Sequence, residues 1–279
     1  TTPYGNSLTT EMAKAAMVAE QLGKGSFTDF IAISYSSPDY IGHSFGPNSW
    51  EIVDNYARLD MELGNLLDFL DKQVGKGQYT IFLTADHAVA HVAGFMKENK
   101  LPGGTVDEEG GMKVVNKKLK ELFGVDSLIL STYNYQLTLN QLAIKNNNLD
   151  RKKIISWTIE YCAKLDGIAR VFEVEELMET PLNSTIKDRI ANGYFPKRSG
   201  DIQLVYQPGY MDGKYTGTTH GLWNPYDSHI PLLWYGWGVK KGNSHREVYM
   251  TDIAATVAAL LKIQMPSGCI GKVIEEVIK

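Results

Sequence analysis

Two short apolar runs separated by one long amphipathic helix constrain the fold of this chain more than any other feature. Residues 29–35 (DFIAISY) and 79–85 (YTIFLTA) are predicted to be buried strands, because both are short, apolar and bounded by turn residues. Between them, apolar residues recur on one face of a helix that opens near Asn48 and ends at Gly75 and Gly77. This strand–helix–strand order predicts a parallel crossover and a doubly wound α/β sheet with helices on both faces.

The pattern changes after residues 101–111 (LPGGTVDEEGG), which are predicted to be a loop by their composition. The next hundred or so residues alternate short helices and strands, with a strand-rich hairpin at 131–139. The core pattern then resumes with a strand at 229–237 and a closing helix at 251–262. We therefore predict three regions: a core α/β part at 1–111, an inserted α+β subdomain at 112–215, and the resumed core at 216–279.

Composition excludes several classes of protein. The 279 residues carry a net charge of -4, so no basic excess suggests a nucleic acid as a partner. No apolar run approaches the roughly 18 residues expected of a membrane span. The two cysteines, Cys162 and Cys269, do not form a disulfide framework. The chain begins at Thr1 without an initiator methionine, so the lack of a signal peptide says nothing about export.

Carboxylate and imidazole side chains occur together in three segments that are distant in sequence. Asp39 and His43 are four residues apart, so one helical turn places them on the same face. Asp86 and His87 directly follow the strand predicted to end at Ala85, and His220 lies in a loop rich in Gly and Thr. Because the carboxyl ends of parallel strands share one edge of a sheet, where ligands bind, the first two pairs are expected to meet there.

Each segment also has an ordinary interpretation. Asp39 could cap a turn beside a solvated His43, Asp86 could cap the turn after its strand beside His87, and His220 could be a simple loop histidine.

The convergence of all three segments on one edge favours a metal centre. Asp39, His43 and His220 would form a two-histidine, one-carboxylate set with open positions, as in catalytic zinc sites. Asp86 and His87 supply only two ligands, so either there is no second metal or its remaining ligands lie outside this chain. Three other histidines are weaker candidates: His91, His229 and His245.

The motifs around these residues resemble those of the alkaline phosphatase superfamily. They are SSPDYIGHSFGP at 36–47, TADH at 84–87 and TGTTHGLWNPYDSHIPLL at 216–233. More narrowly, they are similar to the periplasmic phosphate-irrepressible alkaline phosphatases, which are close to the type I phosphodiesterase/nucleotide pyrophosphatase branch. The resemblance extends to MTDIAATV at 250–257. It implies an α/β/α sandwich with a partial, mostly parallel sheet, and a location in the periplasm.

The resemblance also implies two zinc ions bridged by the phosphate under attack. By motif match, Asp39, His43 and His220 would hold one zinc, while Asp86 and His87 would hold the other together with an Asp from an N-terminal segment. The family nucleophile, a Thr or Ser, belongs to the same segment, and residues 1–279 contain no motif that matches it. The chain is thus predicted to be the C-terminal, metal-binding portion, inactive alone, with the N-terminal segment of the same protein as its partner and small phosphate esters as substrates.

Three functions remain open from the sequence. A zinc-dependent phosphomonoesterase is the leading prediction, and a phosphodiesterase or nucleotide pyrophosphatase of the same superfamily is the alternative within the enzyme class. A metal-binding domain without catalysis is the third. One departure from the family concerns Ala88, which stands where the family usually has Gly. If that position needs positive φ, Ala88 is expected to be mildly strained.

Overall fold

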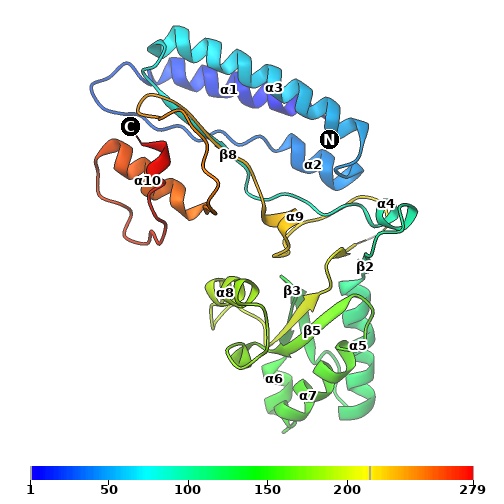
Figure 1. Ribbon diagram of the computed structural model, residues 1–279. Helices are drawn as coiled ribbons and strands as arrows, with labels where there is room; N and C mark the ends of the chain where they lie inside the picture. Colours follow the sequence, from blue (N-terminus) through cyan, green and yellow to red (C-terminus); the bar gives the residue numbers. More distant parts are fainter. Residues whose placement is uncertain (1, 214, 279) are drawn as a thin grey trace. The chain divides into compact units, whose positions relative to one another are not determined.

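The computed structural model describes residues 2–213 and 215–278 (Figure 1). The chain divides into two compact units. The first unit comprises Thr1–Ile41, Val53–Ala88 and His229–Lys279, and the second comprises Gly42–Ile52 and Val89–Ser228. Among the residues described, no helix combines the length and the apolar character that crossing a membrane would require.

Two long helices, α1 (Tyr4–Ala19) and α3 (Trp50–Leu70), lie side by side (Figure 1). The first unit contains α1 and all of α3 from Val53 onward. Asn6 donates a hydrogen bond from Nδ2 to Oδ1 of Asn55 at 3.0 Å, and both side chains are buried. Three buried apolar residues form a small cluster in this unit: Met17, Leu66 and Leu70. The amphipathic face of α3 expected from the sequence is therefore packed at Leu66 and Leu70, whereas Tyr56 nearer its start is 56% exposed. The helix continues into a π-helical turn at Asp71–Gly75.

Strand β1 (Thr80–Thr84) pairs with β8 (Leu232–Gly236) in antiparallel register, with Thr80 opposite Gly236. These two strands and the closing helix α10 (Thr251–Leu261) confirm the predicted elements at 79–85, 229–237 and 251–262. The predicted strand at 29–35 is wrong, because that segment has no regular secondary structure. A strand requires a hydrogen-bonded neighbour, and the partner of β1 is β8. The predicted parallel crossover between these two segments is therefore not formed in the described part of the chain.

The second unit contains most of the remaining elements. Its helices are α4 (Ala93–Glu98), α5 (Glu108–Phe123), α6 (Gln141–Asn146), α7 (Arg151–Cys162), α8 (Ser184–Gly193) and α9 (Pro225–Ser228). Its strands are β2 (Gly104–Val106), β3 (Ile129–Tyr133), β4 (Gln136–Leu139), β5 (Ile168–Glu173), β6 (Ile202–Tyr206) and β7 (Tyr210–Asp212). Strands β3, β4, β6 and β5 form an antiparallel sheet in that order, and β2 pairs with β7 in parallel.

The predicted loop at 101–111 is wrong in part, because it contains β2 and the first turn of α5. Strand β2 is only three residues long and is defined by its pairing with β7, more than a hundred residues later. Helix α5 begins after Asp107, whose side chain accepts a hydrogen bond from the backbone N–H of Gly110. Asp at this N-cap position satisfies a backbone donor that the helix itself leaves free.

Strand β6 lies in the core of the second unit. All five of its residues are buried, because helices cover both faces of the sheet. On one face, Ile202, Leu204 and Tyr206 pack into a core that includes residues of α5 and α7. On the other face, Val205 packs with Ile190 of α8. The second unit therefore encloses a hydrophobic core of its own.

Candidate metal centre

Helix α2 (Ser37–Phe45) places the first two predicted ligands. Asp39 lies in its first turn and His43 in its last turn, so the four-residue spacing puts both side chains on one face. The boundary between the two units falls within this helix, after Ile41, and the helical backbone fixes Asp39 relative to His43. The helix ends at Phe45 and is followed by Gly46, whose φ of 81° few other residues adopt readily.

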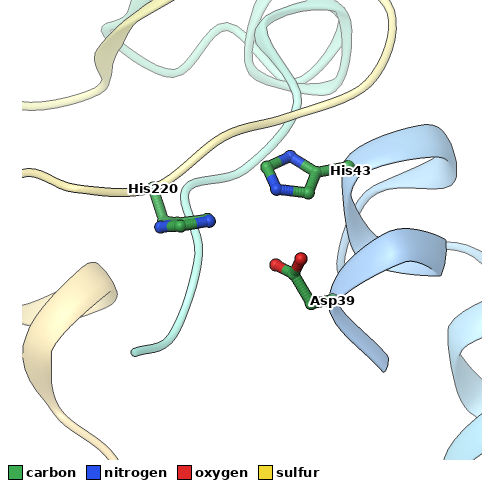
Figure 2. A group of neighbouring side chains, drawn as sticks. All are labelled: Asp39, His43 and His220. Atoms are coloured by element: carbon green, nitrogen blue, oxygen red, sulfur yellow. The ribbon is translucent and has the colours of Figure 1, made fainter. Parts of the chain in front are cut away.

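The third predicted ligand comes from the loop that follows β7. His220 faces Asp39 and His43, as Figure 2 shows. One ligand atom from each residue lies within 4.8 Å of the others, and all three residues are half-buried. The rings of His43 and His220 have centroids 5.0 Å apart. Because zinc ligands lie about 2.1 Å from the ion and hence roughly 3.4 Å from one another, a bound ion would draw this group together.

Thr218 fixes both the position and the tautomer of His43. Its backbone N–H donates to the carbonyl oxygen of His43 at 3.1 Å, and its own carbonyl lies 2.9 Å from Nδ1 of the His43 ring. Because a carbonyl oxygen can only accept, Nδ1 must carry the proton, which leaves the lone pair of Nε2 for a metal. The Thr218 hydroxyl is buried and donates to the carbonyl oxygen of Ala90 at 2.6 Å.

The close contact between this loop and helix α2 depends on glycine. Gly217 has a φ of 78°, and a Cβ atom built there would lie 2.5 Å from the carbonyl oxygen of His43. Any side chain at this position would therefore collide with the backbone of the helix that carries two of the predicted ligands. Gly217 allows the loop to approach, and His220 follows three residues later.

The second predicted pair lies in the first unit. Nδ1 of His87 is 2.8 Å from the carbonyl oxygen of Ala88, so Nε2 again keeps its lone pair. That Nε2 atom lies 3.7 Å from Oδ1 of Asp39 and 3.6 Å from Oδ2 of Asp86. The Asp86 side chain is 86% exposed. Ala88 does not adopt positive φ, so the strain that was expected if the position needed such a backbone does not arise.

The donor atoms suit zinc. Two imidazole nitrogens and one carboxylate oxygen form a borderline-soft set that leaves coordination positions open, as catalytic zinc sites do. Within the described residues, Asp39, His43 and His220 form the group of three ligand side chains close enough to hold one ion. Asp86 and His87 do not complete a second group of three in that part of the chain.

The remaining histidines have other surroundings. Nδ1 of His91 is 2.8 Å from Oδ1 of Asn48, and its ring stacks on Phe95 with centroids 5.3 Å apart. His229 and His245 are exposed. Sequence reasoning missed Thr218 and Gly217 as supports of the site, although both lie within the TGTTHG motif that identified His220.

Comparison with known proteins gives close relatives. The chain is 46% identical over 279 residues to alkaline phosphatase PafA of Elizabethkingia meningoseptica, covering 100% of this chain and 51% of the relative. It is 46% identical over 286 residues to alkaline phosphatase PhoV of Synechococcus elongatus, covering 99% of this chain and 50% of that relative. The chain thus spans about half the length of the curated relatives it matches.

A solved structure shows the same fold. The crystal structure of wild-type PafA matches with a TM-score of 0.97 and 45% identity, over 100% of this chain and 53% of the other. The α/β, alkaline-phosphatase-like fold class predicted from the sequence is confirmed. The sequence profile of the family described as "Type I phosphodiesterase / nucleotide pyrophosphatase" matches residues 4–228. The chain belongs to the type I phosphodiesterase/nucleotide pyrophosphatase family.

Proposed function

We propose that this chain is the zinc-binding portion of a phosphoric ester hydrolase that acts on small phosphate monoesters. The proposal depends on one observation: the potential ligand atoms of Asp39, His43 and His220 lie within 4.8 Å of one another. The relatives named as alkaline phosphatases support the reaction class, and the family description keeps phosphodiester or pyrophosphate cleavage as the second candidate. Export to the periplasm is part of the proposal, since the resemblance implies it.

Each residue has a defined task in this proposal. Asp39, His43 and His220 hold one zinc ion, and Asp86 and His87 hold a second with help from a further carboxylate outside these 279 residues. Bound zinc would supply charge stabilisation for a phosphoryl group in transfer. Thr218 keeps the Nε2 lone pair of His43 directed to the ion through its bond to Nδ1. His87 is oriented in the same way by the carbonyl oxygen of Ala88.

We propose that polypeptide beyond these 279 residues packs against the first unit and supplies the nucleophile. An open groove of about 420 Å³ lies in this unit and is lined largely by apolar side chains of α1 and of the segment at 31–34. Among them, Leu8 is 74% exposed and Met12 is 70% exposed. Contiguous exposed apolar surface of this kind marks interaction sites. The relatives are about twice as long as this chain, which makes additional polypeptide of the same protein the occupant that fits.

The test is the zinc content and activity of the protein and of one ligand variant. The chain should retain at least one zinc after dialysis and show little or no phosphate ester hydrolysis alone. His220→Ala should weaken binding at this site by more than about 100-fold, because it removes a direct ligand. His245→Ala changes an exposed loop histidine and is the matched control. Unchanged zinc affinity in His220→Ala would show that the ligand set is wrong.

Catalysis and simple metal binding can be separated by one further measurement. The protein to test is a longer one that contains this chain together with a segment corresponding to the rest of the relatives. If that protein bound zinc but hydrolysed no phosphate ester, the non-catalytic alternative would be favoured. Parallel assays with a phosphate monoester and a phosphate diester would then decide between the two enzyme candidates. The substrate with the larger kcat/KM belongs to the preferred substrate class.

A further inference from the structure

Tyr135 occupies an unusual backbone position at the tip of the hairpin that joins β3 and β4. The turn has two residues, Asn134 and Tyr135, with φ values of 52° and 61°. Two-residue turns with positive φ at both positions normally place Gly at the second. A large aromatic residue is disfavoured in this conformation, and residues held in such conformations concentrate at functional sites.

The surrounding structure holds Tyr135 firmly in this conformation. Its carbonyl oxygen accepts hydrogen bonds from the backbone N–H of Leu204 at 2.8 Å and from Nε2 of Gln203 at 3.0 Å. Gln203 is only 2% exposed. The Tyr135 ring packs edge-on against Tyr206, with centroids 5.0 Å apart, and also contacts Trp223. Both the backbone and the ring direction of Tyr135 are therefore determined by neighbours from the core of the second unit.

The hydroxyl of Tyr135 reaches the backbone of a predicted metal ligand. It donates a hydrogen bond to the carbonyl oxygen of His220 at 3.2 Å. That carbonyl belongs to the peptide that joins His220 to Gly221, so the bond restrains the backbone directly after the ligand. Gly221 has a φ of 109°, and a Cβ atom there would lie 3.4 Å from the Tyr135 hydroxyl oxygen. On the other side of His220, the carbonyl oxygen of Thr219 accepts from the N–H of Ala90.

We propose that Tyr135 is a positioning residue that fixes the orientation of His220 toward the metal. The Cα–Cβ direction of His220 follows from the backbone on both of its sides, and Tyr135 restrains the side that Thr218 and Thr219 do not. The hairpin of the second unit would thus be used to orient a ligand that lies 85 residues later in the sequence. This inference rests on the proposed metal site, and it adds a residue that carries no ligand atom.

The experiment compares Tyr135→Phe with the unmodified protein and with Tyr133→Phe. Tyr135→Phe keeps the packed ring and removes only the hydroxyl. Tyr133 belongs to the same hairpin but is 79% exposed, so its variant is the control. Three quantities are measured: zinc affinity by competition with a chelating dye, the absorption spectrum of bound Co²⁺, and the thermal midpoint of the metal-free protein. Loss of an outer partner of a ligand weakens metal binding about tenfold or more.

We expect Tyr135→Phe to weaken zinc binding about tenfold, to change the Co²⁺ spectrum, and to leave the thermal midpoint of the metal-free protein unchanged. Tyr133→Phe should match the unmodified protein in all three. Equal zinc affinity and an identical Co²⁺ spectrum in Tyr135→Phe would overturn the inference. So would weaker binding with an unchanged spectrum and a lowered thermal midpoint, since that would indicate general packing. Failure of the unmodified protein to bind zinc would instead overturn the proposed function.

Discussion

The two units differ in how completely they bury their apolar side chains. The second unit encloses a four-stranded sheet between helices, so that every residue of β6 is buried. Among its described residues, the first unit has two strands and a small buried apolar cluster, and large apolar side chains remain exposed, including Phe27 at 87% and Leu8 at 74%. Exposed apolar surface on this scale usually has a partner. The difference indicates that the second unit is stabilised by its own core, and it agrees with the proposal that further polypeptide covers the exposed apolar surface of the first.

The largest expected effect tests the core of the second unit. Leu119 of α5 is fully buried, so Leu119→Ala should lower the free energy of unfolding by about 3 kcal/mol through lost burial and a residual cavity. Leu122→Ala on the same helix changes a residue that is 57% exposed and should stay within about 0.5 kcal/mol of the unmodified protein. Urea unfolding followed by tryptophan fluorescence measures both. Equal effects of the two substitutions would contradict the conclusion that the second unit is stabilised by its own buried core.

A smaller effect tests the open groove of the first unit. Met12→Gln removes apolar surface from that groove, so the fluorescence of an added apolar dye should fall roughly twofold. Leu122→Gln removes an exposed apolar side chain that does not line this groove, and it should leave the dye signal unchanged. Because Met12 is exposed, stability should change by less than about 0.5 kcal/mol. A similar loss of dye signal in both variants would show that the groove binds the dye no better than other exposed apolar surface.

The smallest effects concern two glutamates whose pKa values move in opposite directions. Burial raises the pKa of Glu108 in the second unit above its ordinary 4.5, although Tyr206 and Thr132 donate hydrogen bonds to its carboxylate. Its contribution to stability is therefore fully present below pH 4.5 and is lost as the pH rises through the raised value. In the first unit, hydrogen bonds from Arg246 lower the pKa of Glu276 to about 2, so its contribution is lost as the pH falls from 4.5 toward 2.

Unfolding free energies measured across acidic and neutral pH separate these two contributions. Glu108→Gln should remove a decline in stability with rising pH, and Glu276→Gln should remove a rise. Glu109→Gln changes the exposed neighbour of Glu108 and is the control for helix propensity. If Glu108→Gln and Glu109→Gln gave the same pH dependence, burial of Glu108 would not be the cause of the decline.

The parts of the fold that the sequence predicted correctly are those set by local pattern. The hairpin at 131–139, helix α10 and the spacing of Asp39 and His43 all follow from residues that lie close together in the chain. The predicted strand at 29–35 failed because strand formation depends on a partner, and composition does not reveal which segment will pair. Strand β2 was missed for the same reason, since its partner β7 is distant in sequence. The three predicted regions remain a prediction.

The candidate site shows the same division. Candidate ligand residues could be named because carboxylate and imidazole groups have a recognisable chemistry and a family pattern, and the structure brings Asp39, His43 and His220 together. Their supports could not, because the bonds from Thr218 to His43 and from Tyr135 to His220 join segments far apart in sequence. Nothing in the local sequence of Tyr135 indicates that its hydroxyl donates a hydrogen bond to the backbone of His220. The assignment of Asp86 and His87 to a second zinc remains a prediction.

The glycine at position 217 has a consequence for how this protein can vary. The space for its missing side chain is already filled by the backbone of the helix beneath it, so even alanine would push the loop outward and carry His220 with it. Mutational damage to metal binding should therefore extend to a position with no donor atom and no charge. The lack of space around Gly217 limits which substitutions the position can accept. A screen that ranked residues by chemical reactivity alone would overlook this position.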